Sequence, residues 1–135
     1  MTDEQQLVKD TFTQYSNAFA KLDPKALVPF YHKPAILIDP SRIFSVNSEE
    51  EILKILTPLI EDLKRLDYKR SETTHLGAKL LSENTALVSG IGIRIKKDET
   101  ELAKFGFTYT LRKADGEWKI IAGVIHNIET VLQLE

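Results

Sequence analysis

Residues 105–127, FGFTYTLRKADGEWKIIAGVIHN, carry the clearest structural signal in the chain. Alternating side chains on both sides of Asp115-Gly116 predict two long strands, and this dipeptide favours the positive φ angles of a tight hairpin turn. With both residues at the centre of the turn, Ala114 lies opposite Glu117 and the rest of the pairing follows. The sequence therefore predicts a long antiparallel hairpin near its C-terminal end.

The predicted pairing places eight side chains on one face of the sheet, because side chains alternate along a strand. The expected opposite pairs are Leu111 with Ile120, Tyr109 with Ala122, Phe107 with Val124, and Phe105 with His126. This face is mostly apolar, and its polar groups are the hydroxyl of Tyr109 and the imidazole of His126. One β-bulge in the hairpin would reverse the faces beyond it.

Composition and charge indicate one globular domain over residues 1–135. Of the 135 residues, 42% are hydrophobic and 28% are charged, which is ordinary for a soluble protein. A net charge of −2 and a pI near 5.9 argue against a nucleic-acid partner, since neutralising phosphates requires clustered Lys and Arg. The apolar runs are too short for a membrane span and the N-terminus is polar, so we expect a cytoplasmic protein with no membrane partner.

The remaining elements predict an α+β fold. A capping box and an apolar stripe predict a first helix that ends near Asp23-Pro24, and a short second helix is expected over residues 25–31. A third helix is predicted over residues 49–66, which Pro58 should kink or split. The predicted strands are 35–38, 42–46, 69–81, 86–96, 102–113 and 117–132. Helices followed by a meander of long strands indicate helices packed on one face of a curved, mostly antiparallel sheet.

This order of elements resembles the nuclear-transport-factor-2-like (NTF2-like, cystatin-like cone) superfamily, and in particular its small bacterial members without an assigned activity. The residues that carry the resemblance are Tyr31-His32-Lys33-Pro34, Ala86-Leu87-Val88-Ser89-Gly90 with Arg94, FGFTYTL at 105–111, and Gly116-Glu117-Trp118-Lys119-Ile120. The resemblance implies a cone with a mainly apolar pocket between the first helix and the concave sheet. It does not select one function, because this fold hosts isomerases, cyclases, dehydratases and non-catalytic assembly modules.

The N-terminal third is also similar to ketosteroid isomerase, from Tyr15 through Asp23-Pro24 to Asp39-Pro40. The similarity implies that Tyr15 donates a hydrogen bond to a developing oxyanion and that Asp39 moves the proton. A third member of that family's site, a protonated Asp on a later strand, has no counterpart here. Tyr109 stands in the corresponding region as a second hydroxyl donor.

Other candidate residues each have a structural alternative. His32, at the end of the predicted second helix, could act as a base or interact only with the helix dipole. His126 could be a general base in the pocket or lie at its rim. Arg94 could anchor an anionic ligand group or lie on the outer face. Phe107 and Trp118 are candidates for ligand contacts, although packing also accounts for Trp118.

Three functions remain open at this point. The first is a proton-transfer enzyme, an isomerase, cyclase or dehydratase, that acts on an apolar carbonyl compound through Asp39, with His32 or His126 as the substitute base. The second is a non-catalytic domain that binds such a small ligand, and the third is a dimeric assembly module. The three histidines lie far apart in the sequence and form no metal-binding pattern, so we expect neither a metal nor another cofactor.

A homodimer is expected in each case. Ile91, Ile93 and Ile95 lie on one face of their predicted strand, and Val88 lies on the other. A sheet that is apolar on both faces needs a cover on each.

Overall fold

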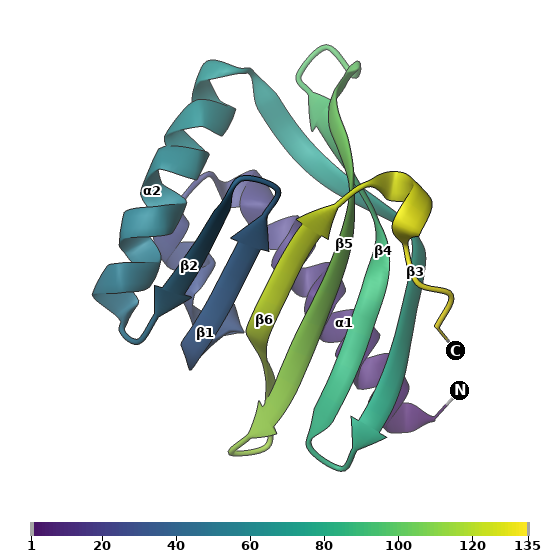
Figure 1. Ribbon diagram of the computed structural model, residues 1–135. Coiled ribbons are helices and arrows are strands. Elements are labelled where there is room, and N and C mark those ends of the chain that lie inside the picture. Colours follow the sequence, from purple (N-terminus) through teal and green to yellow (C-terminus); the bar gives the residue numbers. More distant parts are fainter. Residues whose placement is uncertain (1, 135) are drawn as a thin grey trace.

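The computed structural model describes residues 2–134 as two helices and several short 3-10 turns packed on a curved six-stranded sheet (Figure 1). The helical elements are α1 (Asp3–Ala18), η1 (Phe19–Lys21), η2 (Pro24–Ala26), η3 (Val28–Phe30), α2 (Glu49–Arg65) and η4 (Ile128–Thr130). The strands are β1 (Tyr31–Asp39), β2 (Arg42–Val46), β3 (Tyr68–Ser82), β4 (Thr85–Lys96), β5 (Glu101–Ala114) and β6 (Glu117–His126). The strand order is β2-β1-β6-β5-β4-β3, in which β1 and β6 run parallel and the other pairs antiparallel. The predicted α+β class is confirmed.

Helix α1 begins at the predicted capping box and crosses the inner face of the sheet (Figure 1). The Thr2 hydroxyl accepts a hydrogen bond from the backbone N–H of Gln5 at 3.1 Å, and the Gln5 side chain accepts one from the Thr2 amide at 2.9 Å. Both bonds satisfy N–H groups that have no partner within the helix. The buried stripe of α1 consists of Val8, Phe12, Tyr15 and Ala18.

Pro58 does not split α2, which is one continuous helix from Glu49 to Arg65. Proline inside a helix costs about 3 kcal/mol. The buried stripe of α2 consists of Ile52, Leu56, Ile60 and Leu63. Burying each such side chain contributes about 1.5–3 kcal/mol, so the packing of the whole stripe outweighs the local penalty. No helix within residues 2–134 is long and apolar enough to span a membrane.

The predicted second helix over residues 25–31 is wrong, because this segment forms the two 3-10 turns η2 and η3. Pro29 lacks the N–H that an α-helix needs and disfavours the helical conformation of Val28 before it. Strand β1 therefore begins at Tyr31, earlier than predicted, and His32 lies in a strand and not at the end of a helix.

The predicted hairpin is correct near its turn and shifts by one residue beyond it. Ala114 pairs with Glu117 and Leu111 with Ile120, as expected, but a bulge at Ile121 changes the following pairs. These pairs are Thr110 with Ala122, Tyr109 with Gly123, Thr108 with Val124, Phe107 with Ile125, and Gly106 with His126. The inner face thus keeps Tyr109 and Phe107, whereas His126 is moved to the outer face.

The C-terminal segment lies on the outer face, where the sequence predicted more strand. Strand β6 ends at His126 and not at residue 132. The backbone N–H of Leu132 donates to the Ser89 hydroxyl at 3.0 Å, and the Thr108 hydroxyl hydrogen-bonds both Ser89, at 2.9 Å, and His126 Nε2, at 2.8 Å. These contacts anchor the chain over β4 and β5 instead of extending the sheet.

Candidate functional site

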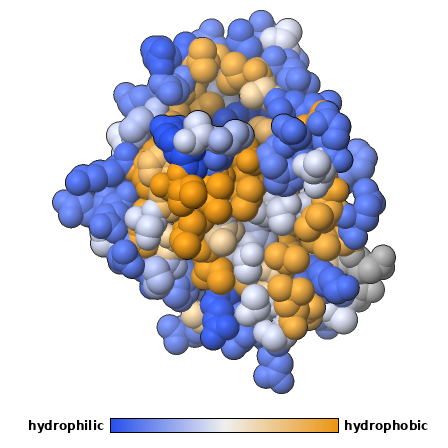
Figure 2. All heavy atoms as spheres, viewed as in Figure 1, coloured by the Kyte–Doolittle hydropathy of each residue, from blue (hydrophilic) through white to orange (hydrophobic). Residues whose placement is uncertain are grey.

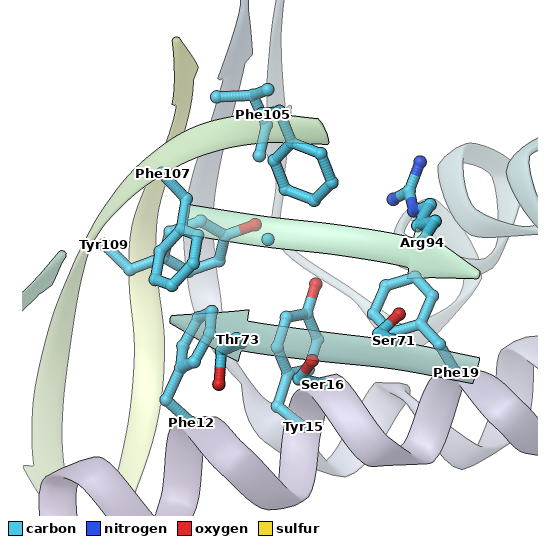
Figure 3. Close-up of a pocket in the computed structure, with 12 residues that line it drawn as sticks. Phe12, Tyr15, Ser16, Phe19, Ser71, Thr73, Arg94, Phe105, Phe107 and Tyr109 are labelled. Atoms are coloured by element: carbon cyan, nitrogen blue, oxygen red, sulfur yellow. The ribbon is translucent and has the colours of Figure 1, made fainter. Parts of the chain in front are cut away.

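The candidate site is a pocket between α1 and the inner face of the sheet (Figure 3). It is lined by Phe12, Tyr15, Ser16, Phe19, Ser71, Thr73, Gly92, Arg94, Phe105, Phe107, Tyr109 and Ile125. The empty space around these residues is about 410 Å³ when open solvent at the mouth is counted, and about 40 Å³ of it can hold the centre of a water molecule. Four of the eight predicted site residues line this pocket, namely Tyr15, Arg94, Phe107 and Tyr109.

Two sequence patterns bring the rings into this pocket. Phe12, Tyr15 and Phe19 follow the helical spacing of three and four residues, so their rings leave α1 on one side (Figure 3). Phe105, Phe107 and Tyr109 alternate along β5, so they face these helix rings from the sheet. The rings of Phe12 and Phe107 stack with centroids 4.4 Å apart and an interplanar angle of 15°.

Glycines on β4 leave room for the rings of the neighbouring strand. Gly92 is paired with Phe105, and a Cβ atom at Gly92 would lie only 2.6 Å from that ring. Gly90 is paired with Phe107, and a Cβ atom there would lie 2.9 Å from the tip of that ring. The rings therefore lie close over the β4 backbone, where Phe107 is covered by Phe12 and Phe105 is only partly buried at the pocket wall.

Three buried tyrosines meet beside the pocket, which Tyr15 and Tyr109 line and Tyr31 does not. The hydroxyl of Tyr15 forms a short hydrogen bond with that of Tyr31 and also interacts with the hydroxyl of Tyr109. Burial raises the pKa of all three phenols, and their mutual proximity raises those of Tyr15 and Tyr109 further. They are neutral at physiological pH and can donate hydrogen bonds, but they do not accept a proton from a substrate.

Arg94 extends from β4 at the end of the pocket nearest Phe19 (Figure 3). Its Cζ atom lies 5.0 Å from the ring centroid of Phe105 and 5.7 Å from that of Phe19. Both distances fall within the range of cation–π contacts. The structure thus places Arg94 on the inner face of the sheet, in the position that a ligand-binding role requires.

Asp39 does not line the pocket, so its carboxylate does not share this cavity with the Tyr15 hydroxyl. Its Oδ1 atom accepts hydrogen bonds from the backbone N–H groups of Ser41 and Arg42, both at 2.9 Å, and from the Ser41 hydroxyl at 3.0 Å. These bonds, first that from the Ser41 backbone, hold the pKa of Asp39 below its usual value. Asp39 stabilises the turn between β1 and β2, which is a usual role of Asp before such a turn.

His32, His126 and Trp118 also lie outside the pocket lining. His32 Nδ1 is 3.0 Å from the Pro34 carbonyl oxygen within β1. The bulge in β6 moves His126 to the outer face, so its predicted position beside Phe105 is wrong. Trp118 is buried and donates from Nε1 to the Glu4 carboxylate at 2.9 Å. This bond links the sheet to α1, and Trp118 does not line the pocket.

The sequence reasoning missed Tyr31 and the helix rings as parts of the site. Tyr31 was assigned to the end of a helix, whereas it begins β1 and its hydroxyl reaches Tyr15. Phe12 and Phe19 belong to the apolar stripe of the first helix, and that stripe alone does not distinguish core from pocket. The signal that could have indicated a pocket was the run of three aromatic residues, Phe12, Tyr15 and Phe19, at successive positions of this stripe.

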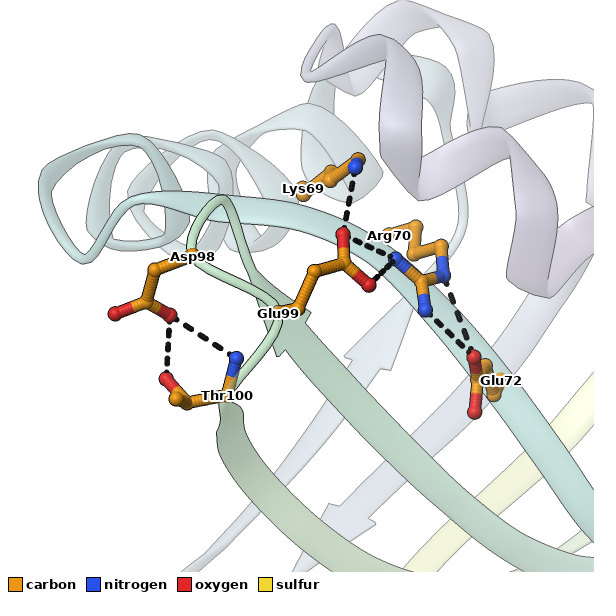
Figure 4. Close-up of polar contacts among 6 residues, drawn as sticks. All are labelled: Lys69, Arg70, Glu72, Asp98, Glu99 and Thr100. Atoms are coloured by element: carbon orange, nitrogen blue, oxygen red, sulfur yellow. Dashed lines mark hydrogen bonds and ion pairs between the residues drawn. The ribbon is translucent and has the colours of Figure 1, made fainter.

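The basic residues at the end of α2 and the start of β3 form ion pairs with neighbouring carboxylates. Lys69 Nζ lies 2.6 Å from the Glu99 carboxylate, and Arg70 contacts Glu99 at 2.8 Å and Glu72 at 2.9 Å (Figure 4). Glu61 and Asp62 pair in the same way with the basic residues Lys64 and Arg65. Each positive charge has an acidic neighbour, and so little remains for phosphate groups. No group of three or more potential metal ligands occurs among residues 2–134.

Comparisons with known proteins place this geometry in a family. The model of a family described as NTF2-like protein (DUF6841) matches residues 3–128 of the chain. No match was found among curated protein sequences.

Solved structures share the fold at low sequence identity. An NTF2-like protein of unknown function from Shewanella oneidensis has 19% identity and a TM-score of 0.73, with 90% of this chain and 98% of that chain covered. A provisionally named dehydratase of the NTF2-like family from Streptomyces avermitilis has 13% identity and a TM-score of 0.73, with 93% and 96% covered. A provisionally named calcium/calmodulin dependent protein kinase II association domain from Xanthomonas campestris has 18% identity and a TM-score of 0.71, with 92% and 87% covered. These identities show a common fold and leave activity open.

Proposed function

Because the chain belongs to this NTF2-like family (DUF6841), we propose that it uses the aromatic pocket to bind a small, mainly apolar molecule and does not transfer protons. The observation that carries the proposal is the chemistry of the lining. Among the described lining residues, six carry aromatic rings and none is Asp, Glu or His. General base catalysis needs a group with a pKa near the working pH within reach of the substrate.

The proton-transfer hypothesis loses its main residues for the same reason. Asp39 is occupied by its own turn, and His32 and His126 lie outside the pocket lining. Tyr15 and Tyr109 could still stabilise an oxyanion as neutral donors, but this requires a base from another source. A carbonyl compound therefore fits our proposal as a ligand of the pocket, and we expect the protein to bind it without converting it.

The test compares a variant that fills the pocket with a matched surface variant. Thr73 lines the pocket from β3, and the adjacent Thr74 is exposed. We expect small aromatic compounds to raise the thermal midpoint of the wild type and of Thr74→Phe, but not that of Thr73→Phe, and to be recovered chemically unchanged. Equal stabilisation of both variants would place binding elsewhere, and conversion of a compound by wild type but not by Tyr15→Phe would favour the enzyme.

We also propose that two copies pair through the outer face of the sheet near β1 and β6, where Figure 2 shows apolar side chains gathered. Ile36 lies beside Ala122 and Ile38 beside Val124 and Ile43, and the exposed fractions are 44% for Ile36 and 73% for Ile43. Patches of this kind on a sheet usually mark a protein interface.

Light scattering at micromolar concentration is expected to give the mass of a dimer for the wild type and of a monomer for Ile36→Lys. Leu7→Lys is the control, because Leu7 is 51% exposed on α1, away from this patch. A charge introduced into a buried apolar interface costs several kcal/mol, which is enough to dissociate an ordinary dimer. A monomeric wild type, or dissociation by both substitutions, would contradict the proposed interface.

A further inference from the structure

Among residues 2–134, Arg94 differs from the other arginines because its guanidinium has no hydrogen-bond acceptor there. Arg42, Arg65 and Arg70 each contact a carboxylate, and Arg112 donates to oxygens of Asn84 and Thr85. Within residues 2–134, no carboxylate lies within 4.0 Å of the Arg94 guanidinium. Its described partners are the faces of two aromatic rings.

This arrangement leaves the guanidinium with unused binding capacity. Arg94 is half-buried, and burial lowers its pKa although the nearby tyrosines partly oppose that effect. Ring faces attract the positive charge but accept none of the five N–H donors in the way an oxygen does. A partly buried charge is expensive unless it is paired. A partner from outside the described residues can reach the guanidinium through the pocket.

We propose that the ligand of this pocket is a small organic monocarboxylate, with its carboxylate on Arg94 and its apolar body against the phenylalanine rings. This inference rests on the proposed binding function and adds the class of ligand. The planar fork of a guanidinium matches the two oxygens of a carboxylate, which allows a bidentate contact.

Charge and shape favour a carboxylate over a phosphate monoester. Arg94 is the only cationic residue among the described lining, and the other polar groups there are hydroxyls, such as those of Ser71 and Thr73. One guanidinium balances the single charge of a carboxylate but only half the charge of a phosphate dianion. Ser71 is paired with Arg94 across β3 and β4, so its hydroxyl is on the correct face to add a hydrogen bond to the same oxygen.

The test uses benzoate, phenylacetate and hexanoate as probes, each with its uncharged amide, and phenyl phosphate as the competing anion. Titration calorimetry is done on the wild type, on Arg94→Gln and on Arg112→Gln, the matched control at an exposed arginine. We expect at least one carboxylate to bind the wild type and the control at least 10-fold more tightly than its amide. Arg94→Gln should remove that preference and leave amide binding unchanged.

Thermal unfolding shows whether Arg94→Gln still folds. Its midpoint is expected to equal or exceed that of the wild type, because the substitution removes an unpaired charge from a partly buried position. A lower midpoint would assign Arg94 a structural role and overturn the inference.

The outcomes separate this inference from the proposed function. Amides that bind as tightly as their acids, or phenyl phosphate that binds more tightly than any carboxylate, overturn the carboxylate assignment and leave the binding pocket intact. If no probe binds and Thr73→Phe is indistinguishable from Thr74→Phe, the proposed function fails and the inference fails with it.

Discussion

Phe107→Ala is expected to lower the free energy of unfolding by about 3–5 kcal/mol, the usual loss for a fully buried phenylalanine. The side chain is 1% exposed, and its ring stacks on Phe12 and meets Tyr109 edge-on with centroids 5.9 Å apart. The cavity left by alanine cannot close easily, because α1 and β5 are held apart by the remaining rings. Since a domain of this size is stable by about 5–15 kcal/mol, the variant should be close to unfolding at physiological temperature.

Phe105→Ala is the matched control for this prediction. Phe105 is on the same strand and the same face, two residues before Phe107, but it lies at the pocket wall and is only partly buried. We expect its loss to be less than half that of Phe107→Ala. Urea denaturation at one fixed protein concentration measures both, because dimerisation would make stability depend on concentration. Equal losses would show that the Phe12–Phe107 stack is not the centre of the core.

The sequence correctly predicted those features of the fold that depend on a few adjacent residues. The capping box at Thr2 and the hairpin turn at Asp115-Gly116 both occur as expected, since each depends on a few adjacent residues. The apolar stripe of α2 was also recognisable in the sequence. The expected break at Pro58 did not occur, because the local cost of proline is outweighed by burial of the stripe against the rest of the protein. Pro29 was the signal that residues 25–31 could not form an α-helix.

One bulge residue decides which side chains of the hairpin face the pocket, and the sequence does not identify that residue. Ile120 and Ile121 are identical side chains before Ala122, so hydrophobic pattern alone does not say which isoleucine is the extra residue of a bulge. That bulge decides the position of His126 while it leaves Tyr109 and Phe107 inside. Half of the predicted site residues therefore line the pocket: Phe107 and Tyr109 on β5, Tyr15 on α1 and Arg94 on β4.

Contacts between distant elements could not be predicted in this way. Tyr15 and Tyr31 lie on different elements, and their hydroxyls meet only because α1 crosses the sheet above the start of β1. Asp39 was selected by similarity to ketosteroid isomerase, yet Ser41 and Arg42 in its own turn satisfy the carboxylate. A local turn thus explained Asp39 better than the resemblance did.

The three buried tyrosines are expected to make the protein unfold in moderately alkaline solution. Burial raises the pKa of Tyr15, Tyr31 and Tyr109 in the folded state, whereas the unfolded phenols titrate near about pH 10. Below that pH both states keep the proton and the stability is complete. Above it the unfolded state releases protons that the folded state retains, so the free energy of unfolding falls as pH rises.

The expected fall is large because the three residues act together. Each contributes up to about 1.4 kcal/mol per pH unit, so these three contribute about 4 kcal/mol between about pH 9 and pH 11. Burial also raises the pKa of Tyr68, which adds to the fall. Urea denaturation across this range measures the slope, and Tyr15→Phe should reduce it by about one quarter to one third. Lysines titrate in the same range in both proteins, so the difference between the two slopes isolates the tyrosine.

Phenolate absorbance supplies the second readout. If the hydroxyls are buried as in the structure, these phenols do not ionise in the folded protein in this pH range. Their phenolate absorbance should then appear together with the loss of the helix signal in circular dichroism. Phenolate that appears well before unfolding, or a slope that Tyr15→Phe leaves unchanged, would mean that water reaches the hydroxyl cluster in the folded protein. In that case the hydroxyls of Tyr15 and Tyr109 would be in contact with water in the pocket.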